Sequence, residues 1–212
     1  MVKHLKPVEL DYGEILYEPG ELLRHVYFPS DSLVSLLTLV DGHLALEVGM
    51  VGSEGMVGFP LGLGIASSQV RALVQGSGRA LKMSAVEFSK QLKRSAALRQ
   101  ELGSYTSALM AQISQTAGCN RFHVVDLRLA RWLLMTRDRV RSTDIHLTHA
   151  FLGHMLGVRR EGVTEAAGKL QKAGLIKYNH GHIRILDQKG LEEAACACYK
   201  SLKDMQPGSP RT

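Results

Sequence analysis

Five residues whose side chains can bind nucleic acid follow Val158 within two turns of a predicted helix. They are Arg159, Arg160, Glu161, Thr164 and Glu165. Arginine and glutamate form hydrogen bonds with base edges, and arginine also pairs with phosphate groups. To contact DNA together, these side chains must be presented on one face of a secondary-structure element. The residues that precede them indicate whether such an element is present.

The segment from Thr148 to Gly157 predicts such an element. Two helices that cross steeply through a short turn need a small residue where they touch and a residue that tolerates positive φ in the turn. Gly153 and Gly157 meet these needs. The apolar residues that would fill the wedge between the helices are Leu152, Leu156, Val158 and Val163. The spacing predicts a helix-turn-helix whose second helix begins near Arg159 and enters the major groove of DNA.

A short hairpin is expected directly after this second helix. The sequence GLIKYNHGHIRILD alternates Ile176 with Tyr178, turns at His180-Gly181, and alternates again from Ile183. This alternation would place Lys177 and Arg184 on the side away from the core, where a wing beside a phosphate backbone needs positive charge.

The charge distribution agrees with a polyanion partner for the C-terminal part. Residues 1–120 carry 10 Lys and Arg against 11 Asp and Glu, whereas residues 121–212 carry 16 against 9. The net charge of +6 therefore results from −1 in the first part and +7 in the second. A one-sided basic domain is typical of proteins that bind nucleic acid.

The N-terminal part has the pattern of an antiparallel β domain. From Glu14 to Leu81, short apolar runs are separated by turn residues such as Pro19-Gly20 and Asp41-Gly42. Near Ser84 the period becomes helical, with Ser84 and Glu87 as a capping box. The expected fold class is α+β, with a β-barrel of the jelly-roll type over residues 1–95, a long helix over 96–120 and a winged helix-turn-helix over 121–212.

The long helix allows two interpretations. Its apolar stripe consists of Leu98, Leu102, Tyr105, Leu109, Ile113 and Thr116. A stripe of this length is either a face that packs on the core of its own chain or a seam that pairs with a second copy. A second helix contains the only tryptophan, Trp132, which is expected in the core.

Other kinds of site are not indicated. The chain has no nucleophile elbow, HExxH or Walker motif, so an enzyme is not expected. The chain has three cysteines, Cys119, Cys196 and Cys198, and an odd number cannot all pair in internal disulfides. This favours a reducing compartment and hence the cytoplasm. As C-x-C on one helix, Cys196 and Cys198 would diverge, so we expect idle thiols and no metal site. No apolar run is long enough to suggest a membrane span or a signal peptide.

This order of elements resembles the Crp/Fnr family of bacterial transcription regulators over nearly the whole chain. The most specific similarity lies in LGVRREGVTEAAGKLQKAGLI and GHIRILDQKGLEEAA, and a looser one in LYEPGELLRHVYFPSDSLVSLL and VGSEGMVGF. The resemblance implies a cyclic-nucleotide-binding-type barrel, a dimerising helix with the seam from Leu98 to Thr116, and a homodimer bound to double-stranded DNA.

The resemblance also implies roles for single residues in DNA recognition. Arg160 and Glu161 match the arginine-glutamate pair of the family's recognition helix, so Arg160 could contact a guanine and Glu161 a cytosine amino group. Glu165 stands where the family has a further arginine, which changes the expected base preference. The expected DNA-contacting residues are Thr148, His149, Arg159, Arg160, Glu161, Thr164, Glu165, Lys169, Lys177, His180 and His182.

The nucleotide site of the family is not matched. Met56 stands where the family has a glutamate for the ribose, and Ala66-Ser67 stand at the arginine-serine position for the phosphate. Arg71 is expected to be a surface or edge charge. A buried phosphate without a counter-charge is costly, so we expect no gating by cyclic AMP or cyclic GMP and no cofactor.

A sequence-specific DNA-binding regulator is therefore the principal hypothesis. The alternative is a regulator-like module that acts through protein or RNA contacts, for which weak and salt-insensitive DNA binding would be the sign. RNA polymerase and an unidentified small-molecule effector are further candidate partners, and the β domain could instead be a scaffold that only fixes the dimer.

Overall fold

The N-terminal domain consists of two antiparallel sheets. The computed structural model describes residues 2–41, 44–179 and 181–205. One sheet has the order β1 (Lys6–Leu10), β7 (Gly78–Ser84), β3 (His25–Pro29). The other has the order β2 (Ile15–Tyr17), β6 (Arg71–Gly76), β4 (Leu33–Val40), β5 (Leu44–Val51). Short 3-10 turns cover Val2–His4 and Phe59–Leu63. The predicted antiparallel β domain is confirmed, with its strands divided between two sheets rather than one closed barrel.

Both sheets contribute to one apolar core. Val26 of β3 and Met83 of β7 lie in the same buried cluster as Val34 of β4 and Val74 of β6. Ala72, two residues before Val74, is also buried, because every second side chain of a strand points to the same face of its sheet. The two sheets therefore enclose the core of this domain.

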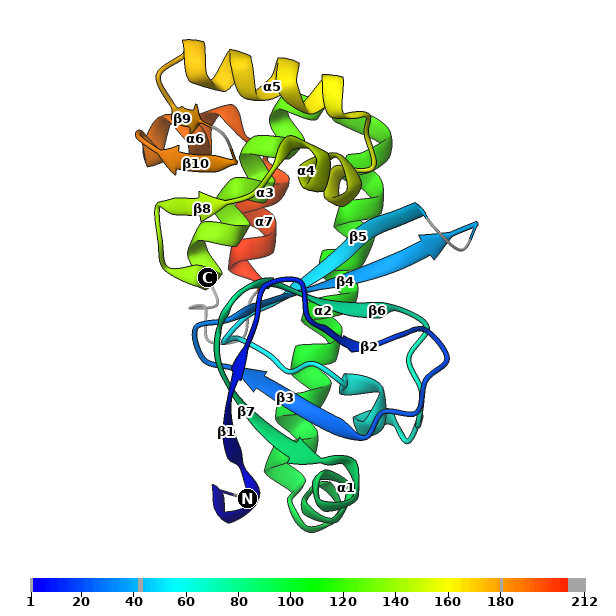
Figure 1. The fold of residues 1–212 in the computed structure, drawn as a ribbon. Helices are drawn as coiled ribbons and strands as arrows, with labels where there is room; N and C mark the ends of the chain where they lie inside the picture. The colour runs from blue at the N-terminus through cyan, green and yellow to red at the C-terminus, as the bar shows by residue number, and fades with distance from the viewer. Residues whose placement is uncertain (1, 42–43, 180, 206–212) are drawn as a thin grey trace.

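Two helices follow the sheets (Figure 1). Helix α1 (Ala85–Arg94) begins at Ser84, whose side chain accepts a hydrogen bond from the amide of Glu87, as the capping pattern predicts. Helix α2 (Ala96–Phe122) has 27 residues and is therefore about 40 Å long. It runs along the β domain from α1 to the C-terminal domain and ends two residues beyond the predicted boundary.

The C-terminal domain surrounds a third helix. It contains α3 (Val125–Val140), β8 (Asp144–His146), α4 (His149–Leu156), α5 (Arg160–Lys172), β9 (Ile176–Asn179), β10 (His182–Ile185), α6 (Gln188–Ala194) and α7 (Cys198–Asp204). Strands β8, β10 and β9 form a small antiparallel sheet in that order. Trp132 on α3 is 2% exposed, so its predicted place in the core is confirmed.

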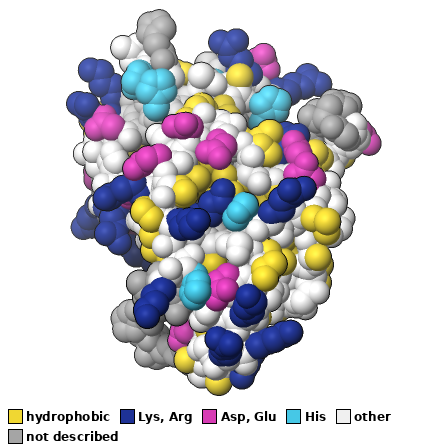
Figure 2. Space-filling view, turned by 60° about the horizontal axis from the view of Figure 1, so that its bottom comes forward, with side chains coloured by type: hydrophobic (Ala, Val, Ile, Leu, Met, Phe, Trp, Pro, Cys, Tyr) yellow, Lys and Arg dark blue, Asp and Glu magenta, His cyan; other side chains and the backbone are white. Residues whose placement is uncertain are grey.

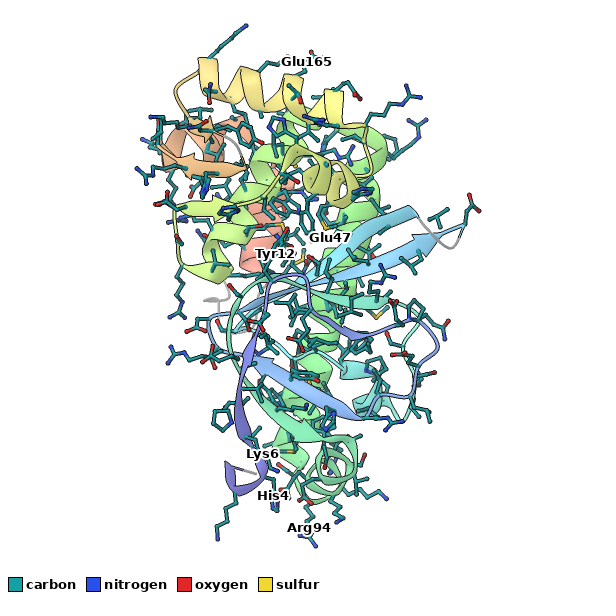
Figure 3. The ribbon with its side chains drawn as sticks, viewed as in Figure 1. His4, Lys6, Tyr12, Glu47, Arg94 and Glu165 are labelled. Atoms are coloured by element: carbon teal, nitrogen blue, oxygen red, sulfur yellow. The ribbon has the colours of Figure 1, made fainter. Side chains whose placement is uncertain are left out.

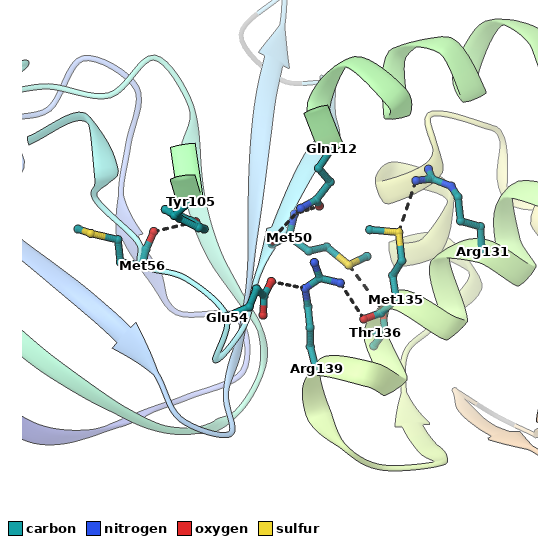
Figure 4. Close-up of polar contacts among 9 residues, drawn as sticks. All are labelled: Met50, Glu54, Met56, Tyr105, Gln112, Arg131, Met135, Thr136 and Arg139. Atoms are coloured by element: carbon teal, nitrogen blue, oxygen red, sulfur yellow. Dashed lines mark hydrogen bonds and ion pairs between the residues drawn. The ribbon is translucent and has the colours of Figure 1, made fainter. Parts of the chain in front are cut away.

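The two domains share a packed interface. Leu33, Leu37 and Met50 of the β domain belong to the same buried cluster as the α3 residues Leu133 and Leu134. Figure 4 shows polar contacts in this region: Nε of Arg139 donates to Glu54 at 2.7 Å, and the Gln112 amide binds the backbone of Met50. In Figure 3, Glu47 lies at the same junction. The C-terminal domain is thereby packed, through α3, against the sheet that carries β4 and β5.

The surface on the β-domain side has mixed character. Figure 2 shows basic, acidic and hydrophobic side chains interspersed on this face. Among the described residues, no helix is both long enough and apolar enough to cross a membrane.

Candidate nucleic-acid interface

The turn between α4 and α5 has the predicted glycine geometry. Gly157 ends α4 with φ +61°, and a Cβ atom there would lie 2.7 Å from Cδ1 of Leu46 on β5. A Cβ on Gly153 would lie 2.9 Å from the carbonyl oxygen of Val158. Leu152, Leu156 and Val163 are buried between the helices. The helix-turn-helix predicted from the sequence is therefore present, with Gly153 required by close approach to the backbone and Gly157 by its positive φ.

The start of α5 is exposed. Arg159 is the N-cap residue, and Arg160, Glu161, Thr164 and Glu165 follow on the outer face with exposed side chains. Helix α5 lies along the end of the molecule opposite α1, and Glu165 points away from the body of the protein. These side chains are thus available to a ligand as large as a DNA duplex.

His149 joins the two helices to the wing. Its Nδ1 lies 2.9 Å from the hydroxyl of Thr164, which itself donates to the carbonyl of Arg160 at 3.0 Å. Because that hydroxyl has only one proton, Nδ1 of His149 is the donor. The ring stacks on Tyr178 with centroids 3.9 Å apart, and burial, followed by the charge of Arg160, lowers the pKa of His149. A neutral His149 therefore supports α5 and the wing from within.

Lys169 is held by two carboxylates in the free chain. Its Nζ lies 2.9 Å from Asp126 on α3 and 3.0 Å from Glu165 one turn earlier on α5. Hydrogen bonds to Asp126 and then to Glu165 raise the pKa of Lys169. A phosphate contact by Lys169 would have to replace these partners, and its predicted role stays a prediction. Sequence reasoning did not identify Asp126.

The wing has the predicted register. Lys177 on β9 is paired with Arg184 on β10, and both side chains are exposed while Ile176, Ile183 and Ile185 are buried. Arg184 also forms an ion pair of 2.7 Å with Asp144 on β8. Of the two basic side chains, Lys177 is therefore the one for which the described residues show no ion pair with a carboxylate.

The other predicted DNA contacts divide into three cases. Thr148 is the N-cap of α4, where its hydroxyl accepts a hydrogen bond from the amide of Phe151. His182 is exposed, with its ring 3.8 Å from that of His146. His180 lies outside the described residues. The contacts expected of all three stay predictions.

The chain is similar to known proteins in both sequence and structure. Residues 127–194 match the model of the Crp-like helix-turn-helix domain. A CRP-family transcriptional regulator from Thermus thermophilus has a similar structure, with a TM-score of 0.74 and 18% identity, covering 89% of this chain and 96% of that one. Residues 127–194 therefore form a Crp-like helix-turn-helix domain, and the chain as a whole has the fold of Crp/Fnr regulators.

Two further structures support the Crp/Fnr fold. A second regulator of this family from Thermus thermophilus is 24% identical with a TM-score of 0.71, covering 90% of this chain and 98% of its own. The c-di-GMP responsive global regulator CLP of Xanthomonas campestris is 18% identical with a TM-score of 0.70, covering 88% and 96%. No curated protein matches the sequence. The predicted fold class is confirmed.

The predicted dimer seam needs correction at three of its residues, which are buried within the chain itself. Leu102, Tyr105 and Leu109 are 5%, 8% and 2% exposed and pack into the core of their own β domain. Leu98 and Ile113 pack against the same core, and Thr116 is half-buried. The apolar stripe of α2 is thus the face that covers the sheet, which was the other interpretation of its periodicity.

The residues singled out at the family's nucleotide site have other partners in this chain. Met56 is buried, and its carbonyl accepts a hydrogen bond of 3.0 Å from Tyr105 of α2. Arg71 binds Glu18 through two nitrogens at 2.8 Å each, consistent with the predicted edge charge. A cavity of about 180 Å³ between the β domain and α2 is lined by Glu54 and Glu101 among mostly apolar residues. Two carboxylates there disfavour an anionic ligand.

The three thiols do not diverge, which corrects an expectation from the sequence. Cys196 precedes α7 and Cys198 begins it, so the two residues are not on one regular helix. Their sulfur atoms gather with those of Cys119 and with the imidazole of His123 at the end of α2. Sequence reasoning missed His123, although its spacing of four from Cys119 on a helix was an available signal.

Proposed function

We propose that this chain is a transcription regulator that binds double-stranded DNA sequence-specifically as a homodimer, with α5 in the major groove. The observation that carries the proposal is the exposed first part of α5, with Arg159, Arg160 and Glu161 beside a basic wing. A Crp-like helix-turn-helix over residues 127–194 supports the same conclusion. The net charge of +7 over residues 121–212 supplies the attraction to phosphate.

Arg160 and Arg159 have different roles in this proposal. Arg160 is the first residue of α5 and binds a guanine edge, whereas the N-cap residue Arg159 binds phosphate. A bidentate arginine-guanine contact gives about 1 to 3 kcal/mol of discrimination, while a phosphate contact gives none. Arg160→Ala should therefore lower base preference at one position in each half-site.

The test is selection of bound DNA from random oligonucleotides, carried out with both variants. Arg159→Ala should weaken binding to all selected sequences by a similar factor and leave the preferred sequence unchanged. If Arg160→Ala retained the same guanine preference as the wild type, the assignment of this residue would be wrong.

In this proposal the homodimer pairs through the exposed face of α2, opposite the apolar stripe that the sequence suggested as the seam. Exposed residues recur there at alternating spacings of four and three: Gly103, Ser107, Met110, Ser114 and Ala117. This spacing is that of a helix pair that packs along one seam, and the small side chains permit close approach of the two helices. A Cβ on Gly103 would meet nothing within 4 Å in its own chain, so this side of α2 is open.

Sedimentation velocity at micromolar concentration tests this seam. The wild type should sediment as a dimer, and Ser107→Arg should raise the dimer dissociation constant by at least about 10-fold because it buries a charge at the seam. Ser201→Arg, at an exposed position on α7, is the matched control and should leave the dimer intact. A wild-type monomer would contradict the proposal.

Cyclic AMP and cyclic GMP are not expected to act as effectors. Arg71 is occupied by Glu18, and Met56 offers a thioether where a ribose hydroxyl would need a carboxylate. Calorimetry with about 100 μM of either nucleotide should show no heat of binding. Micromolar binding that Arg71→Ala abolished would instead indicate a nucleotide-gated regulator.

A further inference from the structure

Four metal-ligating side chains from two distant segments meet at the end of α2. Cys119 and His123 lie one helical turn apart on α2, and Cys196 and Cys198 flank the turn into α7. We call these four residues the Cys-His cluster. Their ligand atoms all lie within 4.8 Å of one another. The cluster therefore joins the helix that covers the β domain to the C-terminal end of the DNA-binding domain.

The spacing of the ligand atoms fits a single ion. The sulfur atoms of Cys119 and Cys196 are 3.9 Å apart, and Sγ of Cys198 is 3.9 Å from Nδ1 of His123. Bond lengths of about 2.3 Å to sulfur and about 2.0 to 2.1 Å to nitrogen give a tetrahedron with edges a little under about 4 Å. The cysteines of an iron-sulfur cluster are divided among two or more iron atoms and are therefore spread more widely. The arrangement matches a Cys₃His site for one tetrahedral ion.

Buried positive charge beside the cluster provides a second, independent observation. Arg128 and Arg131 on α3 are 5% and 4% exposed, and each has an Nε atom without a hydrogen-bond partner among the described residues. Arg128 donates to Asn120 and to the carbonyl of Leu156, and Arg131 contacts the sulfur of Met135. Within the described part of the chain, no carboxylate is therefore seen to hydrogen-bond to either guanidinium.

These arginines need a nearby negative charge. A buried and unpaired guanidinium is costly, and a divalent ion with three thiolates and a neutral imidazole carries one net negative charge. Burial raises the pKa of the Cys196 thiol and Arg131 lies near enough to oppose this shift, while burial followed by the charge of Arg131 lowers the pKa of Arg128. Arg131 is also near enough to the carboxyl of Glu47 to affect its pKa. A metal-thiolate centre would compensate the buried charge of α3.

The cluster also has a supporting outer contact and a route to solvent. Nε2 of Gln115, one turn before Cys119, donates to the sulfur of Cys198 at 2.9 Å. Such N–H···S bonds orient thiolate ligands and stabilise their charge. Cys119 and Cys196 are buried, whereas His123 and Cys198 are half-exposed, so an ion could enter from the side of the latter pair.

We propose that Cys119, His123, Cys196 and Cys198 form a tetrahedral Zn²⁺ site that fastens α7 to the end of α2. Zinc prefers this donor set and this coordination number, and closed Cys₃His sites are structural. The site lies where α2 ends and α3 begins, with His123 as the C-cap residue of α2. A bound ion would therefore fix the DNA-binding domain relative to α2, whether or not the chain binds DNA as proposed above.

The test uses the full chain, purified under reducing conditions and titrated with Zn²⁺ and with Co²⁺ as a spectroscopic probe. Elemental analysis should find one zinc per chain. Cobalt should give the thiolate charge-transfer absorption and the intense visible bands of a tetrahedral site. His123→Ala and Cys198→Ser alter the half-exposed ligands and should lower zinc affinity by more than about 100-fold.

Controls make the outcome decisive. His154→Ala removes an exposed histidine on α4 and should bind zinc like the wild type. Circular dichroism of the two ligand variants checks that they fold, so that loss of zinc reports the ligand and not the fold. Less than about 0.1 zinc per chain, binding unchanged in both ligand variants, or an iron-sulfur chromophore would overturn the proposal.

Discussion

The buried carboxyl of Glu47, at the interface between the two domains, is expected to make the stability of the chain depend on pH. It lies on β5 and is 5% exposed. Its Oε1 accepts a hydrogen bond of 2.8 Å from Nε1 of Trp132 on α3, and its Oε2 accepts one of 2.6 Å from Ser35 on β4. Burial raises the pKa of Glu47 from 4.5 to about 7, against the opposing effects of these hydrogen bonds and of nearby arginines.

The size and sign of the effect follow from this pKa. Between pH 4.5 and pH 7 the folded chain holds a proton at Glu47 that the unfolded chain has released, so the free energy of unfolding falls as pH rises. The stabilising contribution is fully present below pH 4.5 and is lost once pH passes about 7. At about 1.4 kcal/mol per pKa unit, the loss between about pH 5 and pH 8 is about 2 to 3 kcal/mol.

Glu47→Gln is the appropriate perturbation, because the amide keeps an oxygen for Trp132 and can donate to Ser35 without titrating. Urea unfolding at about pH 5 and about pH 8, followed by fluorescence of the only tryptophan of the chain, compares both proteins. From the lower to the higher pH, the wild type should lose about 2 to 3 kcal/mol of stability relative to the variant. Glu193→Gln, at an exposed position, should follow the wild type. Parallel pH profiles for wild type and Glu47→Gln would refute the reasoning.

Four further outcomes are expected. Leu109→Ala should lower the free energy of unfolding by about 2 to 4 kcal/mol in urea, because it leaves a cavity in the β-domain core, whereas Val86→Ala at an exposed position of α1 should change it by less than about 0.5 kcal/mol. Gly157→Ala should destabilise the chain by about 1 to 2 kcal/mol in the same assay, because its φ is +61°. Lys177→Ala should reduce the slope of log affinity against log salt by about 1 in a binding titration. Removing zinc with a chelator should weaken DNA binding by the wild type and leave that of His123→Ala, already without zinc, unchanged.

Local features of the chain were predictable because they depend on neighbouring residues. The cap at Ser84 requires only a serine three residues before Glu87, and the turn at Gly157 requires a residue that adopts positive φ. The wing follows from alternation around one turn, which fixes the pairing of Lys177 with Arg184. These signals, together with the division of charge, were sufficient for the winged helix-turn-helix.

Contacts between distant segments were not predictable in the same way. Periodicity shows that one face of α2 is apolar, but it does not say whether that face covers its own sheet or a second copy, and Leu109 covers the sheet. Cys119 and Cys196 are 77 residues apart, and only the packing of α7 beside α2 brings them together. Glu47 shows no sequence signal for its burial, because its partner Trp132 lies in the other domain.

The most direct test of the proposed function is selection of DNA by the wild-type chain from a random library, followed by a salt titration on the enriched sequence. The predicted result is an inverted repeat with half-sites about 10 base pairs apart, bound with an affinity that falls steeply with salt. The half-site spacing follows from two α5 helices related by the dimer axis. A library that showed no enrichment, or binding that was weak and insensitive to salt, would contradict a sequence-specific DNA-binding function.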